Sequence, residues 1–324
     1  MLLQIGSTGP DVGKLEGRLS ELGLYAGSQD NIFGAGVQAA VKAFQQSNGL
    51  AADGVVGAQT WAALFPGAAT AGATTAGLSP DTPIVQRCLA LTGTFETSMG
   101  IPDCYAGLAG DFDGQGISFG VVQWNIGQGT LQPMLAEMLA QHPDVMAQVF
   151  QGNLAAIQSM LTQPLAAQLA WARSIQDPAR HTLFAPWNGM FQALGRTPEF
   201  QAIEVEHANA IHQAAVGLCQ RFGVTTERAL ALMFDIRVQN GSIGAATEAL
   251  IRTDYAAIPA DAAPMDAEVA KLRSIANRRA EASNPQYVED VRARKLAIAN
   301  GGGTVHGRVY DLEGQFGIRL AVAT

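Results

Sequence analysis

Two carboxylates with contrasting neighbours, Glu96 and Asp113, are the residues of this sequence best placed to do acid–base chemistry. Glu96 ends an apolar run that includes Leu89, Leu91 and Phe95, whereas Asp113 lies in a glycine-studded stretch. A Glu in low-dielectric surroundings stays protonated and can give its proton to a leaving oxygen, while an exposed Asp stays ionised. Glycosidic-bond hydrolysis uses two carboxyl groups in this way. We therefore predict that Glu96 is a general acid and Asp113 the second carboxylate.

The segment 111–122, DFDGQGISFGVV, also begins like a calcium loop. Asp111, Asp113 and Gln115 occupy its first, third and fifth positions, where oxygen ligands are needed, and a glycine follows at the sixth. Such a loop also needs a bidentate Glu at its twelfth position, and that position is Val122. The three cysteines have no metal-ligand spacing either. We therefore predict no metal site and no cofactor.

Helices must position these residues, because apolar residues recur at helical spacing through most of segment 81–324. Only 111–125 and 304–318 have the character of strand or loop. Besides the helix that ends near Glu96, helices are predicted at about 131–141, 144–151, 153–162, 164–176, 198–222, 225–238, 243–252, 264–282 and 285–299. The expected fold is mainly α with a short β-hairpin.

The first 65 residues have the pattern of a separate small helical module. Apolar residues predict helices at about 10–23, 36–47 and 57–64. A turn of Asp, an apolar pair, Gly and a helix start occurs twice, in DNIFGAGVQAAV and in DGVVGAQTWAAL. The Ala/Gly/Thr-rich segment that follows is typical of a flexible linker. We therefore predict three parts, at residues 1–65, 66–80 and 81–324.

The segment VKAFQQSNGLAADGVVGAQTWAAL carries a recognisable set of residues: Val41, Phe44, Gln45, Gly49, Leu50, Asp53, Gly54, Gly57, Thr60, Trp61 and Leu64. On these residues the first module resembles the three-helix type of peptidoglycan-binding domain. It departs from that pattern at Glu16 and at Asn31, although Asn tolerates the positive φ of a turn. The resemblance implies binding to peptidoglycan, with Asp53 and Trp61 as candidate wall contacts. For Trp61, a place in the core is the stronger interpretation.

The stretch FETS, followed by SFGVVQWN, resembles the catalytic Glu and the hairpin of lytic transglycosylases and goose-type lysozymes. The preceding DGQGIS loop is similar to that of chitosanases. These resemblances imply a lysozyme-like, α-rich catalytic domain over 81–324, with Glu96 as general acid and Asp113 as second carboxylate. They also imply that Tyr105, Ser118, Gln123 and Asn125 line the sugar cleft.

A second polar segment, FDIRVQNG at 234–241, lies in a predicted helix. Asp235 and Gln239 share one helix face, so both could reach a cleft. A buried polar pair satisfied by the backbone explains them equally well. We predict Gln239 and the adjacent Asn240 as substrate-binding residues.

The charge of the chain limits its partners. A net charge of −8 argues against a general nucleic-acid binder. Residues 271–308 carry a local excess of Lys and Arg, which suits an anionic polymer such as a cell wall or, more simply, a solvated helix surface. The N-terminus lacks the apolar core of a signal peptide, and no stretch is long enough to span a membrane. We expect a monomer without a membrane anchor, made in the host cytoplasm and released to the wall by a holin.

These features together predict a modular bacteriophage endolysin. It would cleave the β-1,4 bond between N-acetylmuramic acid and N-acetylglucosamine in peptidoglycan and so lyse the cell, either as a hydrolase or as a lytic transglycosylase. One alternative is a chitosanase-like hydrolase of glucosamine polymers. A second is a non-catalytic wall-binding or virion structural protein.

Overall fold

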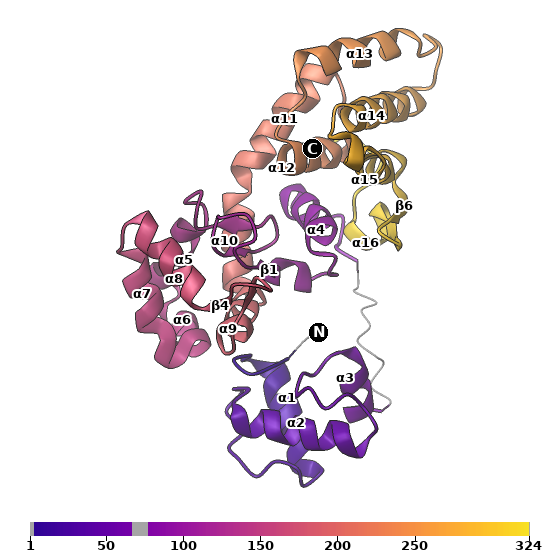
Figure 1. The fold of residues 1–324 in the computed structure, drawn as a ribbon. Helices are drawn as coiled ribbons and strands as arrows, with labels where there is room; N and C mark the ends of the chain where they lie inside the picture. Colours follow the sequence, from indigo (N-terminus) through magenta and orange to yellow (C-terminus); the bar gives the residue numbers. More distant parts are fainter. Residues whose placement is uncertain (1–2, 67–76, 324) are drawn as a thin grey trace. The chain divides into compact units, whose positions relative to one another are not determined.

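The computed structural model describes residues 3–66 and 77–323, which are mainly helical with a few short strands (Figure 1). The chain divides into two compact units, one formed by residues 1–74 and 100–204 and the other by residues 75–99 and 205–324. The predicted fold class, mainly α with a short β element, is confirmed. Among the described helices, none combines the length and apolarity needed to cross a bilayer.

The N-terminal module contains the three predicted helices, α1 (Pro10–Glu21), α2 (Ala35–Ser47) and α3 (Ala58–Leu64). Their apolar faces meet in one core, where Leu15, Val41 and Leu64 are fully buried. Asn31 adopts a positive φ of 62°, as its place in the turn before α2 requires. The predicted linker, 66–80, lies largely outside the described residues, and the predicted domain boundaries stay predictions.

The rest of the first unit surrounds a small antiparallel sheet. It comprises η1 (Asp103–Ala106), β1 (Leu108–Ala109), β2 (Ser118–Phe119), β3 (Trp124–Asn125), α5 (Leu131–Gln141), α6 (Pro143–Phe150), η2 (Gln151–Asn153), α7 (Leu154–Leu161), α8 (Leu165–Ser174), β4 (Gln176–Asp177), β5 (Thr182–Leu183), α9 (Trp187–Gly195) and most of α10 (Pro198–His207). In the sheet Ser118 pairs with Asn125, and Phe119 pairs with Trp124. The Phe119 ring anchors the sheet, because it contacts Phe191 of α9 and Phe200 of α10.

The second unit is a helical assembly closed by a hairpin. It contains α4 (Ile84–Thr97), α11 (Asn209–Phe222), α12 (Glu227–Asn240), α13 (Ala245–Ala256), α14 (Pro264–Glu281), η3 (Pro285–Tyr287), α15 (Val288–Asn300), β6 (Gly302–Val305), β7 (Arg308–Asp311) and α16 (Leu312–Phe316). Helix α12 packs against α4, α11 and α15, and α14 lies between α13 and α15 (Figure 1). Residues 229–236 of α12 are all buried, which makes this helix the centre of the unit.

Three predictions of secondary structure were wrong. Strands β4 and β5 pair outside the two segments expected to be strand or loop. The single helix expected at 198–222 is two helices, because α10 ends at His207 and α11 begins at Asn209. Helix α9 was missed, since Gly189 and Gly195 lower its intrinsic helix propensity. Tertiary contacts favour small residues there: a Cβ on Gly195 would lie 2.6 Å from the backbone oxygen of Tyr105. Close packing thus compensates for the weak local signal.

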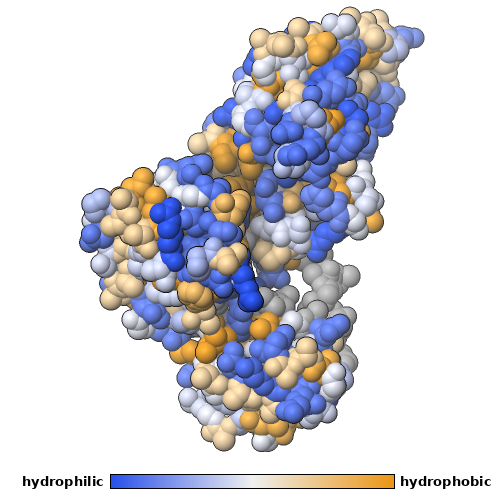
Figure 2. Space-filling view, in the orientation of Figure 1, coloured by the Kyte–Doolittle hydropathy of each residue, from blue (hydrophilic) through white to orange (hydrophobic). Residues whose placement is uncertain are grey.

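The basic segment 271–308 forms much of α14 and α15. Hydrophilic side chains predominate over this part of the surface in Figure 2. Several of the cations are paired within the unit, for example Arg278 with Asp254 at 2.8 Å and Arg292 with Glu289 at 2.7 Å. The local excess of positive charge is therefore partly neutralised by acids on neighbouring positions.

Candidate active site

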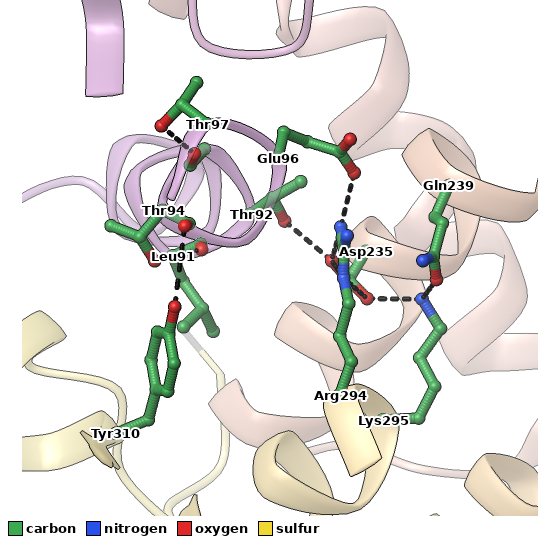
Figure 3. A network of polar contacts seen from close by, with 11 residues as sticks. Leu91, Thr92, Thr94, Glu96, Thr97, Asp235, Gln239, Arg294, Lys295 and Tyr310 are labelled. Atoms are coloured by element: carbon green, nitrogen blue, oxygen red, sulfur yellow. Dashed lines mark hydrogen bonds and ion pairs between the residues drawn. The ribbon is translucent and has the colours of Figure 1, made fainter. Parts of the chain in front are cut away.

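Glu96 lies in the last turn of α4, which ends where Ser98 takes a left-handed conformation with φ 54°. One face of the helix is fixed in the core by residues such as Leu89 and Leu91. The Glu96 side chain is 27% exposed, and its Oε1 accepts a hydrogen bond of 2.6 Å from Nη2 of Arg294 (Figure 3). The expectation of an acid buried in apolar surroundings was therefore wrong, because the end of the helix brings Glu96 out of the core and beside a cation.

Arg294 is held in turn by Asp235, which is fully buried on α12. Nη2 of Arg294 donates to Oδ1 of Asp235 at 2.6 Å, and Nε donates to the same oxygen at 3.0 Å. Thr92 of α4 adds a weaker hydrogen bond to that oxygen at 3.3 Å. One guanidinium group thus bridges the buried Asp235 and the partly exposed Glu96, and three helices, α4, α12 and α15, meet in this contact.

Lys295 is the second cation at Asp235. It contacts Oδ2 of the carboxylate, and its Nζ donates to Oε1 of Gln239 at 2.7 Å. Lys295 and Asp235 are both completely inaccessible to solvent. Two carboxylates, Glu96 and Asp235, are therefore balanced by two cations, Arg294 and Lys295. A buried charge is tolerated when it is paired and hydrogen-bonded in this way.

The pKa values of the buried groups reflect this balance. Burial alone would raise the pKa of Asp235, but Arg294 and Lys295 more than offset it, so that its pKa lies below the ordinary value. Burial, together with the nearby Arg294, lowers the pKa of Lys295 to about 8 although Asp235 opposes this change. At neutral pH both side chains of the pair are therefore charged.

One aromatic ring packs against the guanidinium group, and a second ring supports the first. The carbon Cζ of Arg294 lies 4.9 Å from the centroid of the Phe95 ring, a cation–π distance. Phe95 itself packs against Tyr310 of β7, with ring centroids 4.6 Å apart, and the Tyr310 hydroxyl donates to the backbone oxygen of Thr94 at 3.4 Å. The Arg294 that contacts Glu96 is thus restrained by packing as well as by hydrogen bonds.

Sequence reasoning missed Arg294 and Lys295, although a signal for them exists. In α15 they lie between Val291 and Ile298, at positions that continue the buried face of the helix. Basic residues at core positions require a buried acid, and Asp235 occupies a core position of α12 in the same way. The two observations together predict an ion pair between these helices. They also explain why Asp235 is a buried polar residue satisfied by side chains rather than by the backbone.

The predicted cleft residues of the first unit cluster around its sheet. Asp113 is exposed, and its Oδ1 accepts the backbone N–H of Gln115 at 3.1 Å. The neighbouring Asp111 is paired with Arg173 at 2.5 Å and accepts the N–H of Gly116 at 2.8 Å. Asp111 therefore braces the loop, while Asp113 presents its carboxylate to solvent.

The other residues predicted to line the cleft have mainly structural contacts. Gln123 is half-buried with a positive φ of 60°, and its Nε2 donates to the oxygen of Gly120. Ser118 and Asn125 are buried partners in the sheet, and Asn125 accepts the N–H of Gln128 at 2.9 Å. Tyr105 is only 2% exposed, so its predicted sugar contact was wrong in this arrangement. Its side chain belongs to η1 and is buried in the core instead.

Glu204, which sequence reasoning did not single out, supports this hairpin. It is fully buried, and its Oε1 accepts the N–H of Val121 at 2.8 Å. Its second oxygen is buried without a hydrogen-bond partner among the described residues. Burial raises the pKa of this carboxyl well above its ordinary value. The Gly120–Val121 turn is therefore held by a buried carboxyl group.

The candidate wall contacts of the N-terminal module differ in their surroundings. Asp53 is exposed, but its Oδ1 accepts hydrogen bonds from Gln45 Nε2 at 2.8 Å and from the N–H of Val55 at 2.9 Å. These bonds lower the pKa of the Asp53 carboxyl below its usual value. Trp61 is half-buried and stacks at a tilt on Phe65, with centroids 4.4 Å apart. Asp53 thus has a clear role in shaping its turn, and both residues stay candidates for wall binding.

Within the described ranges no group of three or more His, Cys, Asp or Glu residues is arranged to hold a metal ion. In the loop at 111–113, Asp111 is paired with Arg173.

Comparison with known proteins identifies the N-terminal module. Residues 8–64 match the family model of the putative peptidoglycan-binding domain. Over 59 residues the chain is 42% identical to a spore cortex-lytic enzyme of Bacillus cereus, a match to 18% of this chain and 23% of that protein. Over 57 residues it is 42% identical to the N-acetylmuramoyl-L-alanine amidase CwlM of Mycobacterium tuberculosis, covering 18% and 14% of the two chains. The chain thus matches less than a quarter of the length of these relatives.

Solved structures similar to this chain include chitosanases. The native chitosanase of Bacillus subtilis MY002 has a TM-score of 0.41 and 18% identity, covering 68% of this chain and 87% of that one. The GH46 chitosanase of Gynuella sunshinyii in complex with chitotetraose has a TM-score of 0.43 and 14% identity, covering 71% and 97%. At these scores the similarity carries no inference about activity.

Proposed function

We propose that this chain is a peptidoglycan-degrading glycosidase that cleaves the β-1,4 bond between N-acetylmuramic acid and N-acetylglucosamine. The observation that carries the proposal is the geometry of Glu96. One of its carboxylate oxygens is fixed by Arg294, and the other has no hydrogen-bond partner in the described part of the chain. The match of residues 8–64 to a peptidoglycan-binding family supports the choice of substrate.

The proposed chemistry uses Glu96 as the proton donor. A proton on its unpartnered oxygen passes to the glycosidic oxygen as the bond between that oxygen and the sugar carbon breaks. The sugar carbon then bonds to the oxygen of a water molecule in hydrolysis, or to its own O6 in transglycosylation, and a carboxylate takes up the proton which that oxygen loses. The carboxylate that remains is stabilised by Arg294, which lies 2.6 Å from the other oxygen. Because Asp235 also binds Arg294, the cation is already partly neutralised before the reaction.

In this proposal Asp113 is the second carboxylate. Its exposure suits a group that guides a water molecule, and bracing of the loop is the alternative role. Product mass distinguishes hydrolysis from transglycosylation, because a 1,6-anhydro product lacks one water. We propose further that the enzyme acts as a phage endolysin after holin-type release. Expression in bacteria with and without a co-expressed holin tests that step by the timing of lysis.

The central test is Glu96→Gln, which keeps the size of the side chain and removes its proton chemistry. We expect turbidity loss of cell-wall suspensions to slow by a factor of about 10² to 10⁴, the usual contribution of a general acid. The matched control is Glu289→Gln in the same unit, because the side chain of Glu289 is 82% exposed. The control should clear walls at the normal rate. Equal rates for Glu96→Gln and the unaltered chain would refute the proposal.

A chitosanase-like activity is the second candidate, favoured by the DGQGIS loop at 113–118. Purified peptidoglycan and chitosan should be offered in parallel to the same preparation. Preferential release of reducing ends from chitosan would replace the first candidate with the second. If both polymers stay intact with the unaltered chain, a non-catalytic wall-binding role takes their place.

A further inference from the structure

A pocket of about 450 Å³ opens in the second unit where α12 and α14 end and α15 begins. Its polar lining includes Gln239 and Asn240 from α12, Arg279 from α14, and Ser283 and Tyr287 from the connection to α15. All these residues belong to one compact unit. The pocket is therefore defined without reference to the rest of the chain.

Arg279 is a cation without an acidic partner in this pocket. Its Nη1 makes one long hydrogen bond to Ser283 Oγ at 3.4 Å, and its buried Nε has no partner among the described residues. Burial lowers the pKa of Arg279, whereas Arg278, which is bound to Asp254 and Glu281, has a raised pKa. A guanidinium group offers a planar set of donors that matches a carboxylate. Apart from the long bond to Ser283, the guanidinium group of Arg279 thus has N–H donors that, in the part of the chain that the structure describes, are free to bind a ligand carboxylate.

Two further groups define what fits beside that cation. The Oδ1 atom of Asn240 is buried and has no hydrogen-bond donor within the described chain. It is suited to accept a hydroxyl or amide N–H from a ligand. Tyr287 is 55% exposed and gives the pocket a flat ring of the kind on which sugars pack. The chemistry required of a ligand is an anionic group, a nearby donor and a partly apolar face.

The pocket is linked to the proposed catalytic acid by a series of side-chain contacts through the core of the unit. Gln239 lines the pocket and accepts a hydrogen bond from Lys295, which contacts Asp235. Asp235 is bound by Arg294, and Arg294 is bound to Glu96 (Figure 3). The pocket and the proposed catalytic acid thus belong to the same unit and share one network of polar contacts.

We infer that this pocket binds the carboxylate of an acidic N-acetylamino sugar, with Arg279 pairing with the carboxylate and Asn240 accepting a ligand N–H or hydroxyl. The inference rests on the proposed function for the choice of ligand, because N-acetylmuramic acid carries a lactyl carboxylate. N-acetylglucosamine and glucosamine lack that group. The pocket would thus select peptidoglycan over chitin or chitosan.

One acid, Asp290, also lines the pocket, and it does not form an ion pair with Arg279. Asp290 contacts the His306 ring from the loop between β6 and β7, and no ion pair joins it to Arg279 among the described residues. The Asp290 carboxylate thus makes its polar contact with His306 and not with Arg279. Arg279 remains the cation that a ligand carboxylate would meet.

The test compares two disaccharides that differ at the lactyl group. Titration calorimetry on the intact chain measures the affinity for N-acetylglucosaminyl-N-acetylmuramic acid and for di-N-acetylchitobiose. We expect the first to bind about tenfold more tightly, as one charge-assisted hydrogen bond to a half-buried cation would give. Arg279→Gln should abolish this preference. The control Arg273→Gln removes an exposed cation from the same helix and should keep it.

A second variant guards against a folding defect in Arg279→Gln. Asn240→Asp is isosteric and places a carboxylate in the pocket, so it too should abolish the preference. Equal affinities of the unaltered chain for both sugars, or an undiminished preference in both variants, would overturn the inference. Binding needs no turnover, so this result is independent of wall clearance by Glu96→Gln. If Arg279→Gln and Asn240→Asp lose the preference while Glu96→Gln clears walls at the normal rate, the inference about the pocket stands and the proposed function is refuted.

Discussion

Asp235 offers the most direct test of how the candidate active site is held together. Asp235→Asn removes one negative charge from a cluster in which two carboxylates balance two cations. Arg294 and Lys295 stay buried, and Glu96 alone, 27% exposed, remains to compensate both. Removing one partner of a buried pair costs about 3–5 kcal/mol, because the other charge stays buried without compensation. We expect the free energy of unfolding of the second unit to fall by about that amount.

A second substitution shows whether the cause is charge. Lys295→Met in the Asp235→Asn background removes the extra cation and leaves the Arg294–Glu96 pair. The double variant should therefore be more stable than Asp235→Asn alone, by about 0.5–3 kcal/mol, the usual range for coupled neighbours. Its stability is compared with that of Lys295→Met by itself to complete the cycle.

The assay must report on the second unit alone. Hydrogen exchange followed by mass spectrometry gives the opening free energy of peptides from α12 and α15, with α2 of the N-terminal module as the internal control. Protection should fall in α12 and α15 and stay constant in α2. A change below about 1 kcal/mol in Asp235→Asn, or a double variant no more stable than the single one, would refute the reasoning.

Two further predictions concern buried titratable groups. Glu204 has a raised folded pKa, so the unaltered chain should lose stability relative to Glu204→Gln as pH rises above the unfolded value of about 4.3, by about 1.4 kcal/mol per pH unit until the folded pKa is reached. Urea unfolding at pH 5 and pH 7 measures this, and an equal stability difference at both would contradict it. Burial raises the pKa of the Cys88, Cys104 and Cys219 thiols, that of Cys219 to about 12, so a thiol reagent should label them only after unfolding. Rapid labelling of the native chain would contradict that expectation.

Local patterns predicted much of the helical framework because the apolar spacing is strong. Helix α5 has the predicted bounds, and α14 differs by a single residue. Helix α9 could not be predicted in this way, since its glycines are favoured by contacts with residues distant in sequence. The break between α10 and α11 falls at Ala208, which has no helix-breaking side chain.

The candidate site was harder to predict than the fold. The identity of Glu96 as a candidate came from its position after an apolar run and from its resemblance to known catalytic residues. The surroundings of Glu96 could not be predicted in this way, because Arg294 is far from Glu96 in sequence and belongs to another helix. Tyr105 shows the opposite error, since a motif position says nothing about whether the side chain points into the core. Long-range charge pairing is visible in sequence only when both buried partners are considered together.

The discontinuity of the second unit has a consequence for how such a protein can be recombined. Its acid-bearing helix α4 comes from residues 75–99, whereas its other helices come from residues 205–324. A fragment that begins at residue 205 would keep Asp235, Arg294 and Lys295 but leave Glu96 behind. A single crossover between residues 66 and 74 would replace the N-terminal module without dividing the second unit. The part that carries the proposed chemistry, by contrast, must be inherited as one uninterrupted stretch, including every residue between its two segments.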